Sequence, residues 1–319
     1  MEGEGGTAGP RVLAIGGTTA SGKSRLAMAA ATALSGEIVT ADSAQVYRGM
    51  DIGTDKPDAR ARVVVPHHLL DIRAPSEPFS VAEYQRLADA AIRSVAAAGR
   101  TPLLVGGTGL YLRQVLRGAD LPPAPPQPDL RARLQQEPAE ALWAELARID
   151  LEAASHIHPH NVRRVIRALE IYAVTGQPPS RFVAPACVRY PHVLIVLDRP
   201  SAVLRARITA RVQGMLERGL VAEVRGLLAQ GLDPGAPGLA ALGYRQTVDF
   251  LVRGGTLTEL AAAIADATWQ YARRQRTWFR RDPDAVWIDL EDGSAEDALA
   301  RVLDVWWGTS RGDPAPNPA

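Results

Sequence analysis

The chain has almost no lysine. Of its 36 lysine and arginine residues only Lys23 and Lys56 are lysines, and asparagine is equally scarce. The simplest explanation is a compositional bias that replaces lysine by arginine wherever either cation serves. A compact ammonium and a planar guanidinium are not interchangeable at tight sites. The two remaining lysines therefore mark positions where we expect arginine not to serve.

Cysteine and long apolar runs are also missing. The single cysteine, Cys187, excludes an intramolecular disulfide and a cysteine-based zinc site. No apolar run approaches the roughly 18 residues that span a bilayer. The first ten residues contain two glutamates and no charged-then-apolar signal pattern. We expect a cytoplasmic protein that does not contact membranes.

The overall composition is that of a globular protein. Hydrophobic residues make up 46% of the chain and charged residues 22%, which excludes a disordered or fibrous chain. The net charge of +1 argues against a general nucleic-acid coat but is compatible with local basic patches. A length of 319 residues indicates one large domain or two.

Short apolar segments alternate with helical patterns along most of the chain. This alternation predicts an α/β fold with a parallel sheet covered by helices on both faces, as in P-loop NTPases. Functional residues then lie at the carboxyl ends of the strands. The predicted strands are Val12–Gly16, Glu37–Thr40, His68–Ile72, Pro102–Val105, Val193–Asp198 and Val286–Leu290.

The alternation stops near residue 119. Leu121–Pro128 contains five prolines, which is typical of a linker, and about sixty residues of helical pattern follow without a convincing strand. We interpret 119–190 as a helical insertion domain between two halves of the core, 11–118 and 191–308. The ends, 1–10 and 309–319, are predicted to be disordered tails.

One segment matches the phosphate-binding loop G-x-x-x-x-G-K-[ST], which needs a strand before it and a helix after it. Its backbone N–H groups and the helix N-terminus form a nest for a diphosphate or a nucleotide such as ATP. Lys23 adds a point charge, and Ser24 can bind Mg²⁺. The predicted binding residues are Gly17, Thr18, Thr19, Ala20, Ser21, Gly22, Lys23 and Ser24.

The loop alone does not specify the reaction. Phosphoryl transfer usually needs an acid after a later strand, and Gly106-Gly107-Thr108 offers none, although Asp71 could replace it. Asp42 follows the second strand, where it could act as a general base or simply cap a helix. Gln45 has the donor and acceptor needed to read an adenine edge. A kinase remains open at this point.

Taken together, the motifs resemble the tRNA dimethylallyltransferases, which prenylate an adenine beside the anticodon. The resemblance covers nearly the whole chain, and Thr18 stands where the family usually has proline. The markers, in order, are Gly17–Ser24, Asp42–Tyr47, Ile52–Pro57, His67-His68, Leu70-Asp71, Gly106–Tyr111, Ile157–Pro159, Arg163–Glu170, Gly243-Tyr244 and Arg274–Phe279.

The resemblance implies a monomeric, Mg²⁺-dependent enzyme that transfers a dimethylallyl group from dimethylallyl diphosphate. The acceptor is the N6 amine of the adenine 3′ of the anticodon, in tRNAs that read codons beginning with U. Diphosphate leaves and no phosphoryl group moves, which accounts for the missing acid after the fourth strand. The implied catalytic residues are Lys23, Asp42, Thr108 and Arg211, with Arg207 one turn earlier as the alternative to Arg211.

Two arginine-rich segments are candidates for holding the tRNA. Arg163–Arg167 lies in the insertion, and Arg273–Arg281 interleaves arginine with two aromatic residues, which suits phosphate contact and base stacking. Charge alone would equally fit a solvated helix face, and the resemblance favours tRNA. The predicted tRNA-binding residues are Asp42, Ser43, Ala44, Gln45, Thr108, Arg131, Arg163, Arg164, Arg167, Arg273, Arg274, Gln275 and Arg280.

Three other functions are compatible with a phosphate loop: prenyl transfer to free AMP, ADP or ATP, as in cytokinin synthesis; a small-molecule P-loop kinase; and a nucleotide-binding module without chemistry. A nucleotide-sized acceptor needs neither the insertion nor the arginine-rich segments. The last two give no reason for Asp42–Tyr47 and Arg274–Phe279 to occur together.

Overall fold

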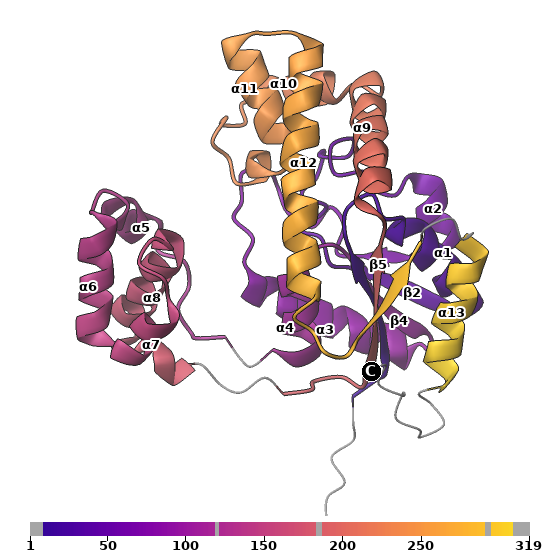
Figure 1. The fold of residues 1–319 in the computed structure, drawn as a ribbon, viewed down its shortest axis with the longest axis horizontal. Helices are drawn as coiled ribbons and strands as arrows, with labels where there is room; N and C mark the ends of the chain where they lie inside the picture. Colours follow the sequence, from indigo (N-terminus) through magenta and orange to yellow (C-terminus); the bar gives the residue numbers. More distant parts are fainter. Residues whose placement is uncertain (1–8, 119–120, 183–186, 291–294, 309–319) are drawn as a thin grey trace, which may run out of the picture. The chain divides into compact units, whose positions relative to one another are not determined.

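The computed structural model describes residues 9–118, 121–182, 187–290 and 295–308 (Figure 1). The predicted tails lie outside these residues, apart from Gly9 and Pro10. The chain forms two compact units, one of Met1–Leu116 with Arg189–Ala319 and one of Arg117–Val188. No helix in the described part of the chain combines the length and the hydropathy that crossing a bilayer requires.

The larger unit is built on a six-stranded parallel sheet, which confirms the predicted fold class. Its strand order is β3-β2-β4-β1-β5-β6. The strands are β1 (Val12–Gly17), β2 (Gly36–Thr40), β3 (His67–His68), β4 (Thr101–Val105), β5 (His192–Asp198) and β6 (Ala285–Asp289). The third strand is shorter than predicted, because Leu69 and Asp71 adopt left-handed backbone angles, with φ of 65° and 57°, that end it.

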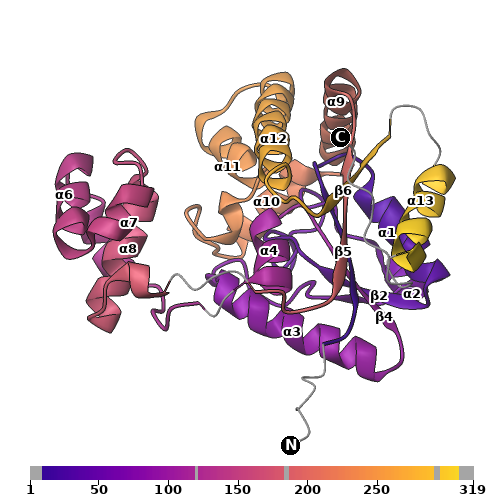
Figure 2. The ribbon, with the colours of Figure 1, turned by 60° about the horizontal axis from the view of Figure 1, so that its bottom comes forward.

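Helices cover both faces of this sheet (Figures 1 and 2). Side chains alternate along β1, so Leu13 and Ile15 pack toward α1 (Lys23–Ala33) and α13 (Ala295–Gly308). Val12 and Ala14 face the opposite layer, formed by α3 (Val81–Ala97) and α4 (Gly109–Arg117). Burial on both faces explains why these strands are continuously apolar.

A further group of helices follows β5 and carries its own core. Its helices are α9 (Ser201–Glu217), α10 (Leu220–Ala229), η2 (Gly238–Ala240), α11 (Tyr244–Arg253) and α12 (Leu257–Phe279). α9 and α10 are separate helices, because Gly219 takes a φ of 97° between them. This core also buries Val46 and Met50 from the segment after β2. These helices thereby fix the segment after β2 at the carboxyl edge of the sheet. The short helix α2 (Ala59–Val64) follows this segment.

The smaller unit is entirely helical in its described part. It consists of α5 (Pro128–Leu134), α6 (Ala139–Ile149), α7 (Leu151–His156), α8 (Val162–Thr175) and η1 (Pro179–Phe182). Leu142 and Leu146 of α6 pack against Val165, Ile166 and Leu169 of α8 to form its core. Because these apolar residues recur at helical spacing, the helices bury one face each and need no sheet.

Candidate active site

The phosphate-loop motif forms the turn between β1 and α1. Gly17 has a φ of 131°, and a Cβ there would lie 2.1 Å from the carbonyl oxygen of Leu197, so only glycine fits. Gly22, with a φ of 109°, begins α1. The loop amides therefore curve around the N-terminus of α1, as anion binding requires.

A cavity of about 390 Å³ opens beside this loop. Arg211 of α9 donates to Thr19 Oγ1 at 3.2 Å, and Arg207 donates to the carbonyl of Ala20 at 2.8 Å. The structure thus brings both candidate arginines to the loop. The cavity is lined by Ala20, Gly22, Lys23, Ser24, Arg25, Asp55, Arg207, Ala210 and Arg211. Its charge balance is strongly positive, which favours an anion.

Lys23 is poised between its charged and neutral forms. Its Nζ donates to the carbonyl of Thr18 at 2.6 Å. Burial, and then the charge of Arg211, lower the pKa of Lys23 to about 7, while Asp42 and Asp198 oppose this shift. An anion in the cavity would favour the ammonium form.

Asp42 and Thr108 meet at the carboxyl ends of β2 and β4, which are neighbours in the sheet. Asp42 Oδ1 accepts the N–H groups of Ala44 at 2.8 Å and Gln45 at 3.2 Å. Thr108 Oγ1 accepts the N–H of Ser43 at 3.2 Å. Asp42 therefore caps a turn through one oxygen, and no described residue hydrogen-bonds its Oδ2. The capping role and a role at the site are compatible.

The side chain of Gln275 in α12 connects the phosphate loop to the segment after β4. Its side chain is 5% exposed. Its Oε1 accepts the N–H of Thr19 at 2.8 Å, and its Nε2 donates to the carbonyl of Gly107 at 2.8 Å. Tyr271, one turn earlier, also reaches Gly107, and burial raises its pKa to about 12, with Asp42 adding to the shift. The sequence predicted Gln275 as a tRNA contact, but its polar groups are already used to hold the phosphate loop.

A second inward contact from α12 was not predicted. Arg276 makes a two-pronged ion pair with Asp198 at the end of β5, with Nε–Oδ2 at 2.6 Å and Nη2–Oδ1 at 2.9 Å. Thr18 Oγ1 also donates to Asp198 at 3.3 Å. An acid at the end of a buried strand was the only sequence signal for this pair.

The other arginines of the segment Arg273–Arg281 face solvent. Arg273, Arg274, Arg280 and Arg281 are exposed. A cavity of about 370 Å³ on α12 is lined by Gln270, Arg273, Arg274, Thr277, Trp278 and Arg281. Cations beside an indole ring suit phosphate contact and base stacking.

In the smaller unit, two predicted tRNA-binding arginines hold a buried acid. Glu170 is fully buried, and Arg131 donates to its two oxygens at 2.7 and 2.8 Å. Arg167 also pairs with Glu170 and donates to the carbonyl of Ala124 at 2.9 Å. Burial opposes ionisation, but these hydrogen bonds keep the pKa of Glu170 low. Arg131 and Arg167 therefore serve the fold, whereas Arg163 and Arg164 are exposed.

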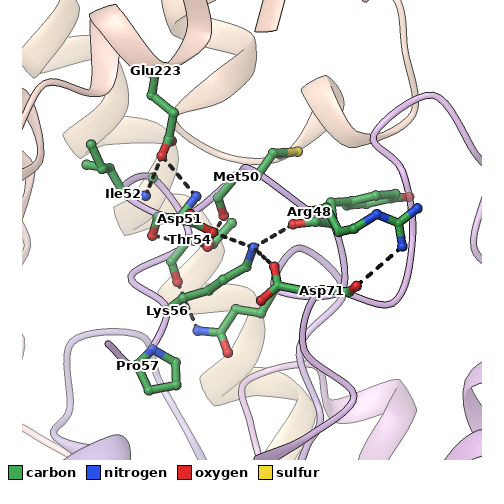
Figure 3. A network of polar contacts seen from close by, with 12 residues as sticks. Arg48, Met50, Asp51, Ile52, Thr54, Lys56, Pro57, Asp71 and Glu223 are labelled. Carbon is green, nitrogen blue, oxygen red and sulfur yellow. Dashed lines mark hydrogen bonds and ion pairs between the residues drawn. The ribbon is translucent and has the colours of Figure 1, made fainter. Parts of the chain in front are cut away.

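Lys56, whose role the sequence left open, is the centre of a buried polar network (Figure 3). Its side chain is 1% exposed. Its Nζ donates to the carbonyl of Tyr47 at 2.5 Å, to Asp51 Oδ1 at 2.7 Å and to Asp71 Oδ1 at 2.6 Å. Asp71 Oδ2 accepts from Arg62 at 2.8 Å. Both oxygens of Asp71 are therefore engaged, which argues against the kinase role considered for it.

Helices α10 and α11 hold the other side of the loop that contains Lys56. Glu223 of α10 accepts the N–H groups of Asp51 at 3.0 Å and Ile52 at 2.9 Å (Figure 3). Tyr244 donates to Glu223 at 2.6 Å and accepts the N–H of Gly53 at 3.2 Å. A Cβ at Gly53 would lie 2.5 Å from the Tyr244 ring. Gln45 Nε2, predicted to face tRNA, donates to the carbonyl of Thr54 at 3.0 Å.

Comparison with known proteins places this architecture among RNA-modifying enzymes. Residues 45–282 match the model of the IPP transferase family. The chain is 46% identical over 299 residues to a tRNA dimethylallyltransferase of Roseiflexus sp. (strain RS-1), covering 92% of this chain and 98% of that protein. It is 48% identical to the tRNA dimethylallyltransferase of Salinispora arenicola, covering 91% and 86%.

Two solved structures are similar over most of the chain. The tRNA isopentenylpyrophosphate transferase of Bacillus halodurans has a TM-score of 0.72 and 39% identity, covering 94% of this chain and 97% of that one. A eukaryotic dimethylallyltransferase described as acting on tRNA has a TM-score of 0.81 and 26% identity, covering 94% and 80%.

Proposed function

Because the chain belongs to the tRNA dimethylallyltransferase (IPP transferase) family, we propose that it transfers a dimethylallyl group from dimethylallyl diphosphate to tRNA. The acceptor is the N6 amine of the adenine 3′ of the anticodon, in tRNAs that read codons beginning with U. The products are N6-isopentenyladenine and diphosphate. The observation that carries this proposal is the cationic phosphate-loop cavity near the Asp42–Thr108 pair.

The donor site is the cavity beside the phosphate loop. Lys23, Arg207, Arg211 and the loop amides compensate the negative charge that builds up on diphosphate as the carbon–oxygen bond breaks. Ser24 is exposed in the first turn of α1. Its hydroxyl is the kind of hard oxygen ligand that Mg²⁺ takes alongside substrate phosphates. Bound Mg²⁺ would add further charge neutralisation.

The acceptor chemistry belongs to Asp42 and Thr108. The amine attacks the first carbon of the allyl chain, the N6–carbon bond forms, and the electron pair of the broken bond leaves with diphosphate. Asp42 takes the amine proton as a general base. Thr108 Oγ1 is fixed by the N–H of Ser43, so its own hydroxyl proton can turn toward the acceptor base.

Binding the tRNA requires a surface outside this cleft, because the adenine must leave its stack. In each unit we assign this role to exposed arginines: Arg163 and Arg164 in the smaller unit, and Arg273, Arg274 and Arg280 in the larger one. We assign Ser43, Ala44 and Gln45 to the acceptor side as well, because their backbone N–H groups hold Thr108 Oγ1 and Asp42 Oδ1. We propose a monomer that acts in the cytoplasm, where its tRNA substrate is.

The decisive assay offers labelled dimethylallyl diphosphate to the protein with unmodified tRNA or with AMP. We expect label in tRNA only. Label in AMP only would replace this proposal by the cytokinin-type reaction. The same assay tests the base: Asp42→Asn keeps an oxygen for the turn and should lower turnover about 10²- to 10⁴-fold at unchanged tRNA affinity. Turnover within twofold of wild type would exclude Asp42 as the base.

A further inference from the structure

One acidic side chain stands in the otherwise cationic cavity of the phosphate loop. Asp55 is the only acid among the residues that line it. Its Oδ2 lies 3.2 Å from Nη2 of Arg211, and its Oδ1 lies 3.3 Å from Nη2 of Arg218. Arg218 ends α9 two turns after Arg211, so one carboxylate bridges two arginines on the same helix.

The position of this carboxylate is set by its backbone. Asp55 has a φ of 52°, in the left-handed region, which aspartate and asparagine tolerate better than other non-glycine residues. The segment around Asp55 is anchored by two contacts. Lys56, the next residue, pairs with Asp51, and Glu223 accepts the N–H groups of Asp51 and Ile52 (Figure 3). The carboxylate is therefore held toward α9 before any ligand arrives.

Arg211 is consequently shared between two neighbours. Its Nη1 donates to Thr19 in the phosphate loop, and its Nη2 pairs with Asp55. Arg207, one turn earlier, contacts the loop through Ala20 instead and forms no ion pair with a described residue. A diphosphate entering the cavity thus meets Arg207, which has no acidic partner among the described residues, and Arg211, whose Nη2 already faces Asp55.

We propose that Asp55 competes with diphosphate for Arg211 and so sets the affinity of the donor site for the diphosphate group. The inference rests on the proposed function, because that function identifies the anion. When diphosphate occupies the cavity, Arg211 turns its Nη2 toward it and Asp55 keeps Arg218. When diphosphate leaves, Asp55 takes Arg211 back, which speeds release of the product.

Binding of inorganic diphosphate, measured by titration calorimetry in EDTA at fixed ionic strength, tests this directly. Asp55→Asn removes the charge and keeps a residue that tolerates the left-handed backbone, so the loop should remain folded. We expect about 5-fold tighter binding, the size expected from releasing Arg211 from a partly exposed ion pair. Asp249→Asn makes the same charge change at an exposed position outside the cavity and should leave affinity unchanged.

A second background shows whether the effect passes through Arg211. In Arg211→Gln, the Asp55→Asn change should tighten binding less than twofold; an undiminished gain there would overturn the competition. Unchanged or weaker binding in the single variant Asp55→Asn would also overturn it, while leaving the donor site intact if the wild type binds. Absence of diphosphate binding to the wild type both in EDTA and with Mg²⁺ present would instead overturn the donor-site proposal, and this inference with it.

Discussion

Lys56 can be tested by removing its charge while keeping most of its length, as in Lys56→Met. The three hydrogen bonds of its ammonium are lost, but they contribute unequally to the stability of the protein. Asp51 is 59% exposed and can turn to water, whereas Asp71 is 30% exposed and keeps Arg62. The carbonyl of Tyr47 loses the donor that Lys56 supplies. After subtracting the desolvation of the ammonium, we expect a loss of about 2–3 kcal/mol in the free energy of unfolding.

Thermal unfolding followed by circular dichroism measures this loss. About 2–3 kcal/mol should lower Tm by about 3–5 °C in a protein of this size. Hydrogen exchange should accelerate at the amides of Asp51, Ile52 and Gly53, which lie in the same loop. Lys56→Arg should lose a similar amount, since a planar fork cannot place three donors where one Nζ stands.

The matched control is Arg62→Met, which removes the second, more exposed partner of Asp71 together with a hydrogen bond to the carbonyl of Pro57. It should cost less than about 1 kcal/mol, as exposed ion pairs do. If Lys56→Met melts within about 2 °C of wild type, or no lower than Arg62→Met, the network does not stabilise the loop and the reasoning fails.

The same network makes a pH prediction. Burial alone would raise the pKa of Asp71, but hydrogen bonds from Lys56 and Arg62 hold it below its ordinary 3.8. Its stabilising contribution is therefore complete above about pH 4 and is lost as pH falls through the lower native pKa. In Lys56→Met the loss of stability on acidification over this range should be smaller than in the wild type.

Three further predictions concern the proposed site. Diphosphate affinity should fall as pH rises above about 7, because Lys23 then loses the proton that the anion needs, and binding at pH 8.5 should take up protons. Gln275→Leu should raise KM for dimethylallyl diphosphate by about tenfold through a loosened phosphate loop, the equivalent of one lost hydrogen bond, and leave tRNA affinity unchanged. Replacing Arg274 and Arg280 by alanine should weaken tRNA binding and lower its salt slope by about 0.7–0.9 per lost phosphate contact.

Each of the three has its own control. Lys23→Met should abolish the proton uptake, and uptake that persists would assign it to another group. Weaker tRNA binding in Gln275→Leu would show that Gln275 does contact RNA. Arg225→Ala, at an exposed position of α10, should leave the salt slope unchanged; an unchanged slope in the Arg274 and Arg280 variant as well would assign those arginines to solvent.

Local sequence patterns were enough to predict the fold class of this protein. The apolar strands and the phosphate loop are encoded in short segments, because alternation, helical spacing and turn glycines act over a few residues. The scarcity of lysine also had meaning: Lys23 lies in the phosphate loop, and Lys56 lies where three acceptors surround one ammonium. Backbone conformation set finer limits, as at Leu69 and Gly219, which pattern alone did not reveal.

What the sequence by itself determined was the architecture, the family and the group of residues at the carboxyl edge of the sheet. Only the tertiary structure decided which arginines are available. Arg131 meets the buried Glu170, 39 residues away, and Arg276 meets Asp198, 78 residues away. An arginine on a helix has the same appearance in the sequence whether it faces solvent or a distant acid. Its partner is chosen by packing between segments far apart in the chain, which no local pattern encodes.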